Sequence, residues 1–164
     1  MSTRILIVDD DEVSCQLFAE TLELDGFSVE QVTSGDAALA RLEADTYDLL
    51  LIDVRMPGTS GLEVTRIAHN KFPALPIVVM TAFGSIDTAV EAIHEGAFDF
   101  ISKPMNLAEI KSILSRALAQ RSLQHGAEKQ ANQDDEYPSE LGKIIGKSAA
   151  MVGVYKTVAR VAPT

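Results

Sequence analysis

The sequence predicts an α/β protein in which five parallel strands form one doubly wound sheet with helices on both faces. Five short apolar runs alternate with five stretches in which apolar residues recur at helical spacing. Such alternation is typical of parallel sheets joined by right-handed crossovers. The central run, 48–58, reads DLLLIDVRMPG, so four consecutive apolar residues lead to the carboxylate of Asp53. A strand buried on both faces that ends in an acid predicts a site at the carboxyl edge of the sheet.

The first half of the chain accounts for three strands and two helices. The strands are short runs rich in aliphatic residues, and we expect them at 4–8, 27–32 and 49–53. The first helix, 13–24, has its apolar residues near helical spacing, namely Val13, Leu17, Ala19, Leu22 and Leu24. Gly26 is a suitable residue to end it. The second helix, 35–44, is rich in good helix formers.

The second half continues the alternation. A helix over 61–71 follows the Pro57–Gly58 loop, and strands are expected at 77–81 and 97–101. Between these strands, Ser85 can cap a helix that ends at Glu95. A C-terminal helical extension starts near Asn106, with one apolar face made by Leu107, Ile110, Ile113, Leu114, Ala117 and Leu118.

We expect the flavodoxin-like strand order 2-1-3-4-5, which makes the first and third strands neighbours. Asp9 and Asp10 follow the first strand, so they would meet Asp53 at one edge. Three crowded carboxylates need a compensating cation or proton. Hard oxygen ligands favour Mg²⁺, Mn²⁺ or Ca²⁺ over zinc, and few protein ligands suit Mg²⁺ best. The alternative at Asp9 and Asp10 is an acidic helix N-terminus without a metal.

Two further strand ends reach the same edge. Thr81 ends the fourth strand with a hydroxyl, and Lys103 follows the fifth with an ammonium. A carboxylate beside a cation, a lysine and a hydroxyl can accept and hold a phosphoryl group. Asp53 would be the nucleophile, Lys103 would pair with a phosphoryl oxygen, and Thr81 would donate a hydrogen bond.

Four motifs occur in order: VDDD at 8–11, LLIDVRMPG at 50–58, MTA at 80–82 and ISKP at 101–104. With them, residues 3–120 resemble the receiver domain of two-component response regulators. The resemblance implies that a histidine kinase phosphorylates Asp53. It also implies a cis bond before Pro104.

The same resemblance assigns the remaining roles in the site. It implies that Asp10 binds Mg²⁺ directly, that Asp9 assists through water, and that the backbone carbonyl of Arg55 is another ligand. It makes the Ala82 amide a donor to the phosphoryl group. Thr81 and Phe100 become the switch pair, in which the aromatic ring turns inward as the hydroxyl moves to the phosphate. The third acid, Asp11, leaves the register of the acidic pair slightly ambiguous, and spacing favours Asp9 and Asp10.

We expect a receiver domain over 1–121, a linker over 122–140 and part of a second domain over 141–164. The last stretch reads LGKIIGKSAAMVGVYKTVARVAPT. Its IIG, S-A-M and APT pattern resembles the start of the AAA+ ATPase domain in NtrC-type activators of sigma-54 RNA polymerase. The competing interpretation is a helical output segment of another family. We expect a homodimer through the region Ser85–Leu118. Sigma-54 RNA polymerase and DNA would be contacted only through domains absent from this chain.

Charge and composition narrow the partners. Residues 1–121 hold nine basic and nineteen acidic residues, whereas residues 122–164 hold five of each. The acidic first part disfavours direct nucleic-acid binding. Apolar runs fall short of the ~20 residues of a membrane span, so no membrane association is expected. The single cysteine, Cys15, fits a cytoplasmic protein.

Two other functions use similar residues. One is a Mg²⁺-dependent phosphatase or phosphotransferase of the haloacid dehalogenase type, which also has a nucleophilic aspartate. Such enzymes favour an Asp-x-Asp motif, and position 55 here is Arg. The other is a receiver used only for dimerisation, against which the complete set of acids, Thr81 and Lys103 argue. We therefore expect no enzyme activity beyond the domain's own phosphorylation and dephosphorylation.

Overall fold

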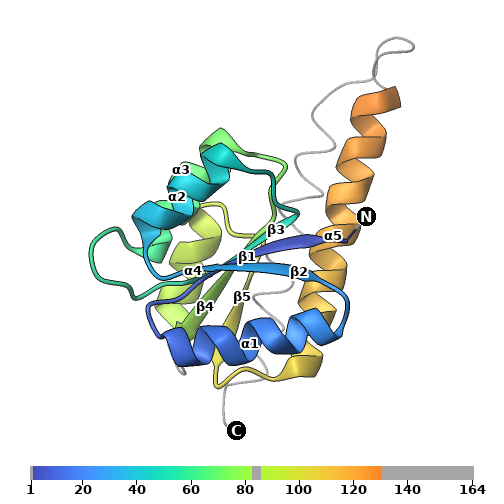
Figure 1. The fold of residues 1–164 in the computed structure, drawn as a ribbon. Coiled ribbons are helices and arrows are strands. Elements are labelled where there is room, and N and C mark those ends of the chain that lie inside the picture. Colours follow the sequence, from blue (N-terminus) through green and yellow to red (C-terminus); the bar gives the residue numbers. More distant parts are fainter. Residues whose placement is uncertain (1, 83–85, 131–164) are drawn as a thin grey trace, which may run out of the picture. The chain divides into compact units, whose positions relative to one another are not determined.

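The structure, a computed structural model, describes residues 2–82 and 86–130, with side chains through residue 124. Five parallel strands form one sheet in the order β2-β1-β3-β4-β5 (Figure 1). The strands are β1 (Arg4–Val8), β2 (Ser28–Val32), β3 (Leu49–Asp53), β4 (Ile77–Ala82) and β5 (Asp99–Lys103). The predicted doubly wound sheet and its strand order are confirmed.

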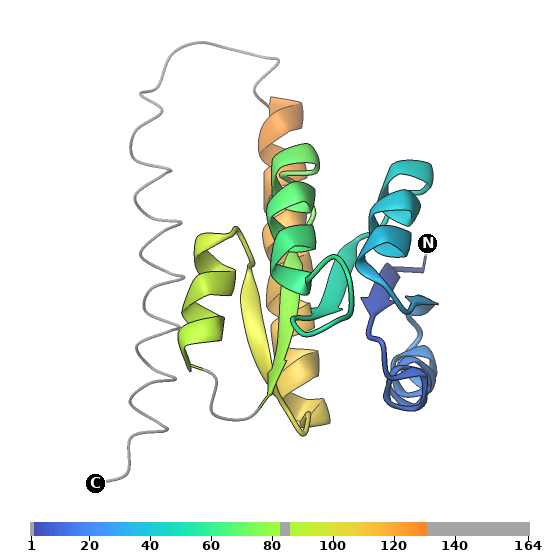
Figure 2. The same ribbon diagram turned by 90° about the vertical axis from the view of Figure 1, so that its left-hand side faces the viewer.

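Helices cover both faces of the sheet (Figures 1 and 2). They are α1 (Glu12–Leu24), α2 (Gly35–Ala44), α3 (Gly61–Lys71), α4 (Ile86–His94) and α5 (Leu107–Gln130). Side chains of α2, α3 and α4 pack on one face, and side chains of α1 and α5 pack on the other. Residues 1–122 form one compact unit. No helix in the described part of the chain is long and apolar enough to cross a membrane.

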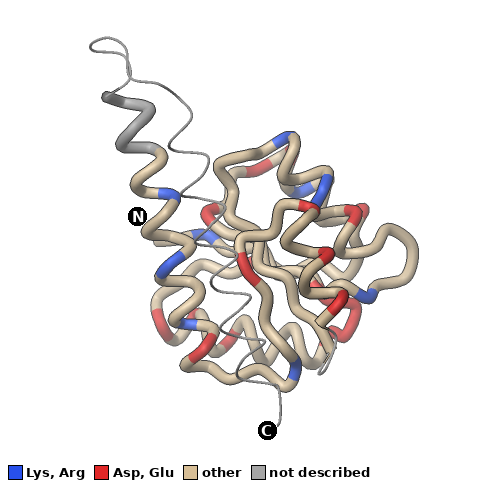
Figure 3. The backbone as a smooth tube through the Cα atoms, turned by 180° about the vertical axis from the view of Figure 1, so that it is seen from behind, with Lys and Arg blue, Asp and Glu red and all other residues tan. Residues whose placement is uncertain are grey.

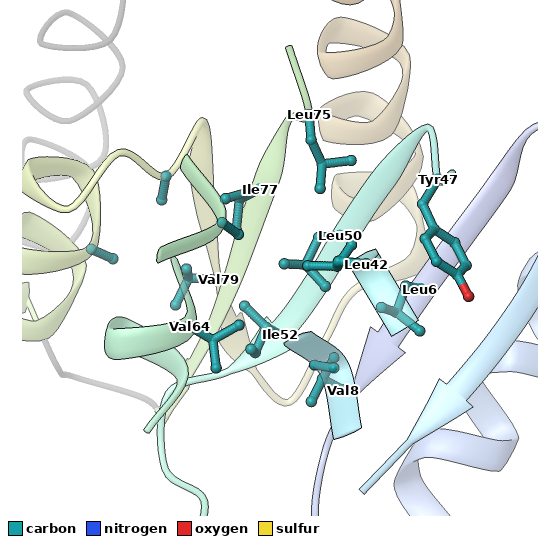
Figure 4. Close-up of a cluster of buried hydrophobic side chains, with 14 of the residues drawn as sticks. Leu6, Val8, Leu42, Tyr47, Leu50, Ile52, Val64, Leu75, Ile77 and Val79 are labelled. Carbon is teal, nitrogen blue, oxygen red and sulfur yellow. The ribbon is translucent and has the colours of Figure 1, made fainter. Parts of the chain in front are cut away.

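The core follows from the two-residue period of the strands. In β1 and β3, Leu6, Val8, Leu50 and Ile52 face the α2–α4 side, and Figure 4 shows them in one cluster with Ile77 and Val79 of β4. Their odd-numbered neighbours on each strand face the α1–α5 side. Every residue from Leu49 to Ile52 has an exposed fraction of 0%. The prediction that the central strand is buried on both faces is therefore confirmed.

The register sets the positions of the strand ends. Val8 is paired with Ile52, so Asp9 leaves β1 beside Asp53 at the end of β3. On the other side, Thr81 is paired with Ser102 and Ala82 with Lys103. The carboxyl edge of four adjacent strands thus carries the residues singled out in the sequence.

The bounds predicted for the fifth strand are wrong. The strand expected at 97–101 lies at Asp99–Lys103, because the N–H of Ala97 closes the end of α4 by donating to the carbonyl of Ala92. Lys103 consequently belongs to β5 instead of following it. In α1, the apolar residues noted in the sequence divide between core and solvent: Ala19 and Leu22 are buried with Cys15 and Phe18, whereas Val13, Leu17 and Leu24 are exposed.

Helix boundaries otherwise differ from expectation by a residue or two, within the usual fraying of helix ends. In α5, four residues of the predicted apolar face are buried, namely Ile110, Ile113, Leu114 and Ala117.

Some expectations concern residues that the structure does not describe. Ser85, expected to cap α4, lies outside the described residues. The expected linker and second domain lie outside them from residue 131 onward. The helix continues through Gln130, beyond residue 121, where we expect the receiver domain to end.

At the amino edge of the sheet, Tyr47 connects β2, β3 and α5. Its hydroxyl donates to Glu30 Oε2 at 2.6 Å, and its backbone carbonyl accepts from Arg121 at 2.8 Å. The guanidinium of Arg4 lies over its ring, 4.9 Å from the centroid. Burial and the hydrogen bond to the Glu30 carboxylate raise the pKa of Tyr47 to about 12.

This shift predicts a decline in stability at high pH. Below pH ~10 the tyrosine is protonated in both states, and between pH ~10 and ~12 it ionises in the unfolded chain first. The free energy of unfolding therefore falls across that interval. Tyr47→Phe is expected to be about 1 kcal/mol less stable at pH 7 and to lose less stability from pH 9 to 11. Denaturant unfolding of both proteins across this range measures it. An equal decline in both would contradict the assignment.

Candidate functional site

Three carboxylates meet at the carboxyl edge of β1 and β3. One oxygen each from Asp9, Asp10 and Asp53 lies within 4.8 Å of the other two. Asp9 and Asp53 are buried, with exposed fractions of 2% and 9%, whereas Asp10 is exposed. The predicted convergence of these acids is confirmed. Such proximity of like charges is unfavourable unless a positive charge offsets it.

Lys103 supplies that positive charge. Its Nζ donates to Asp9 Oδ2 at 2.7 Å and to Asp53 Oδ2 at 2.5 Å, so one ammonium connects the first and third strands from the fifth. Burial disfavours the charged amine and lowers its pKa, but the hydrogen bonds to Asp53 and Asp9 outweigh burial and leave the pKa raised. Lys103 is therefore a fully charged ammonium at neutral pH.

The two buried acids are held in the same way. Asp9 Oδ1 accepts the N–H of Asp11 at 3.0 Å, and Asp53 Oδ1 accepts the N–H of Arg55 at 2.9 Å. In each acid one oxygen thus binds the amide two residues later, and the other binds Lys103. Each acid is therefore held by one rigid backbone donor and by the charged Lys103 side chain. The arrangement is a pre-organised acidic site with one cationic side chain.

Asp11 does not belong to the acidic cluster. Its side chain caps α1, accepting from the N–H groups of Val13 and Ser14 and from the Ser14 hydroxyl at 2.7 Å. The hydrogen bond from the Ser14 hydroxyl is the largest cause of the lowered pKa of Asp11. Because the Asp11 side chain caps α1, the two acids that lie beside Asp53 are Asp9 and Asp10.

The remaining predicted residues lie on β4, on β5 and after β3. Thr81 is the last buried residue of β4, with an exposed fraction of 2%, and Ala82 is exposed next to it. Phe100 is partly buried on β5, opposite Val79, and packs against the α2–α4 side of the core. Residue 55 places its N–H on Asp53, and the ligand role of its carbonyl stays a prediction. The Lys103–Pro104 bond is cis, as the resemblance implied.

Cys15 lies in the first turns of α1, close enough to the site for the Asp9 carboxylate to influence it. Burial, reinforced by that carboxylate, raises the pKa of its thiol to about 11. The thiol is therefore protonated at neutral pH and packs as a small apolar group.

Residues 5–115 match the family of the response regulator receiver domain. The chain belongs to this family. Receiver domains of two-component systems accept a phosphoryl group on an aspartate, and the clustered acids and lysine are present in this receiver domain.

Relatives of this receiver domain are transcriptional regulators. ZraR of Salmonella typhimurium, a transcriptional regulatory protein, is 37% identical over 160 residues, which are 98% of this chain and 35% of ZraR. NtrC of Klebsiella pneumoniae, a DNA-binding transcriptional regulator, is 35% identical over 94% of this chain and 32% of NtrC. The crystal structure of NtrX from Brucella abortus in complex with ADP is 30% identical, with a TM-score of 0.76, over 100% of this chain and 35% of NtrX. The chain thus spans about a third of these relatives.

Sequence reasoning missed two buried residues of α3, the helix that begins against the backbone of Asp53. Gly61 and Thr65, in the first turns of α3, are both buried, and Gly61 touches the backbone of Asp53. The glycine after the Pro57–Gly58 loop was a usable signal, because a glycine opening a helix suggests restricted space. A close backbone approach, however, is a property of three-dimensional packing.

Proposed function

We propose that this receiver domain is phosphorylated on Asp53 by a histidine kinase and switches an attached transcription activator. The observation that carries the proposal is the ammonium of Lys103, which contacts both Asp9 and Asp53 at the end of buried strands. Asp53 is the only carboxylate of the three that lies at the end of the central strand β3. It is therefore the acid toward which the neighbouring strand ends converge.

The donor set fits Mg²⁺. All the candidate ligands are hard oxygens: Asp10, Asp9, Asp53 and the carbonyl of Arg55. Exposure of Asp10 suits direct coordination, and burial of Asp9 beneath Lys103 suits an assisting role. When bound, Mg²⁺ would supply positive charge that offsets charge on the phosphoryl oxygens during transfer.

In the transfer itself, an oxygen of Asp53 forms a bond to phosphorus. The bond between phosphorus and the imidazole nitrogen of the kinase phosphohistidine breaks, and its electron pair leaves with that nitrogen. Lys103 then exchanges its hydrogen bond to Asp53 for one to a phosphoryl oxygen. Thr81 and the Ala82 amide, on the adjacent strand, donate to the other oxygens.

We propose that phosphorylation is transmitted through Thr81 and Phe100. Movement of the Thr81 hydroxyl to the phosphoryl group vacates space into which the partly buried ring of Phe100 turns. The surface of α4, β5 and the start of α5 changes shape as a result. Shifting a population from mostly inactive to mostly active takes several kcal/mol, roughly 5, of preferential binding to the active arrangement. Charge-assisted bonds of the phosphoryl group to Lys103 and Thr81 are of that order together.

A phosphate mimic tests this switch. Beryllofluoride is expected to alter amide hydrogen exchange across residues 86–118 and to change the pairing of two receivers through that surface. Exchange mass spectrometry and solution scattering, with and without the mimic, measure both effects. Asp53→Asn is the matched control because it removes the carboxylate to which the mimic binds. Unchanged exchange and assembly in the wild type would refute the switch.

The attached activator is proposed from the relatives. Similarity to ZraR and NtrC over nearly the whole chain supports a parent of the NtrC type, in which an ATPase domain acts with sigma-54 RNA polymerase. In that parent, residues 1–121 are the receiver, 122–140 the linker and 141–164 the start of the ATPase domain. DNA and polymerase contacts belong to the other domains, since acidic positions dominate this one (Figure 3). The protein is placed in the cytoplasm, where its kinase would act.

Phosphorylation by a small acyl phosphate separates this function from its alternatives. With Mg²⁺, the protein is expected to take up about one acid-stable, hydroxylamine-labile phosphoryl group per chain. A phosphatase of the haloacid dehalogenase type would instead turn over many equivalents of donor, and position 55 lacks the second acid it needs. A receiver used only for dimerisation would take up none.

A further inference from the structure

Gly61, the first residue of α3, lies directly against the backbone of Asp53. A Cβ placed on Gly61 would be 2.0 Å from the carbonyl oxygen of Asp53, 2.8 Å from its carbonyl carbon and 2.9 Å from Val54 Cα. Neighbours this close are backbone atoms of the central strand, which cannot rotate away as a side chain could. Any side chain at position 61 must therefore displace either α3 or the end of β3.

Space alone requires glycine at position 61. The glycines with positive φ in the described residues are Gly26, Gly58 and Gly96. At Gly26 and Gly58 an added Cβ would meet nothing within 4 Å. At Gly61 the opposite holds: its backbone conformation is open to any residue, but the neighbouring backbone leaves no space for a side chain. The close approach is therefore the reason for a glycine here.

One backbone hydrogen bond joins the first turn of α3 to the residue after β3, and a second joins that residue to β4. The N–H of Gly61 donates to the carbonyl of Val54 at 3.0 Å, and the N–H of Val54 donates to Met80 in β4 at 3.1 Å. One turn later, the Thr65 hydroxyl donates to the carbonyl of Gly61 at 2.7 Å. Thr65 has an exposed fraction of 0%, and the other buried polar side chains in the described residues are Asp9, Asp53 and Thr81, all in the site.

We propose that Gly61 is a positioning residue for Asp53, and that Thr65 secures it. The first turn of α3 packs against the backbone of Asp53 and fixes the end of β3. In this position Asp53 Oδ1 accepts the N–H of Arg55, and Asp53 Oδ2 accepts from Lys103. This inference rests on the proposed phosphorylation of Asp53. It adds that the reaction depends on a backbone contact with a residue that never touches the phosphoryl group.

The expected effect of Gly61→Ala follows from the distances. An atom at 2.0 Å has to move by more than an ångström to reach ordinary van der Waals contact, and a misplacement of that size costs roughly a hundredfold in rate. We expect the maximal rate of phosphorylation by a small acyl phosphate to fall by that factor. The donor concentration giving half the maximal rate is expected to change little, because the donor does not contact Gly61.

Gly96→Ala is the matched control. It also crowds a glycine, placing a Cβ 2.3 Å from His69 Cγ at a positive φ, but at the opposite end of β5 from the site. Both variants are expected to lose stability, and only Gly61→Ala is expected to lose maximal rate. Phosphorylation at equal maximal rates in the two folded variants would overturn the positioning role. Absence of phosphorylation in the wild type would instead refute the proposed function.

A second pair of variants decides the matter if Gly61→Ala does not fold. Thr65→Val keeps the volume of the side chain and removes the hydrogen bond to Gly61, whereas Thr65→Ser keeps the hydroxyl. We expect a severalfold lower maximal rate in Thr65→Val and recovery in Thr65→Ser, measured with wild-type protein alongside. Equal rates in all three, or no recovery in Thr65→Ser, would overturn the proposal.

Discussion

Asp53→Asn is expected to reduce phosphorylation by a small acyl phosphate by on the order of a thousandfold or more, to the background of the assay. The amide is nearly isosteric with the carboxylate but is not a nucleophile toward phosphorus. Labelling of the purified protein in the presence of Mg²⁺, followed over time, measures the loss. Labelling at the wild-type rate would show that another residue is the acceptor.

The fold of this variant is expected to persist. The substitution removes one partner of Lys103, which keeps Asp9 at 2.7 Å, and it also removes repulsion among the three acids. These effects oppose each other, so a cooperative melting transition is retained. Asp45→Asn, an equivalent charge change at the exposed end of α2, is the matched control and is expected to be phosphorylated normally.

Mg²⁺ is expected to raise the melting temperature of the wild type. A ligand that binds only the folded state stabilises it by about 2.7 kcal/mol at a hundred times its dissociation constant. For a domain of this size that corresponds to roughly 10 °C. The shift is expected to be lost in Asp10→Ala, because that substitution removes the exposed carboxylate of the cluster. Thermal melts with and without Mg²⁺ provide the measurement.

Asp11→Ala distinguishes metal binding from a general effect of negative charge. Asp11 is adjacent to Asp10, but its side chain is used to cap α1. The variant is expected to melt at a lower temperature without Mg²⁺ and to retain the full Mg²⁺-dependent shift. A shift of equal size in Asp10→Ala and the wild type, or its loss in Asp11→Ala, would contradict the assignment of the acidic pair.

Much of the site could be predicted because strand order alone brings its residues together. Asp9 and Asp53 each follow a buried apolar run, and the parallel pairing of β1 with β3 leaves them side by side. Lys103 lies beside Asp9 and Asp53 as expected, even though its strand was placed two residues too early. An error of two residues in a strand boundary does not move a nearby residue away from the carboxyl edge of the sheet, where the ends of all the parallel strands lie.

Features that depend on packing could not be predicted in the same way. In α1 the apolar residues lie on more than one side of the helix, so periodicity alone did not show that Phe18 is buried while Leu17 is exposed. The start of β5 depends on how Ala97 closes α4. The contact between Gly61 and Asp53 joins residues eight apart through a loop, and only the folded backbone reveals how closely they approach.

Locating the phosphoryl group tests most directly whether Asp53 is the phosphoacceptor. After reaction with a small acyl phosphate and Mg²⁺, the protein would be treated with hydroxylamine, digested and analysed by mass spectrometry. We expect a hydroxamate at Asp53 and none at Asp9, Asp10 or Asp11. A modification at any of those three acids, or a hydroxylamine-resistant phosphoryl group on a serine or threonine, would contradict this assignment.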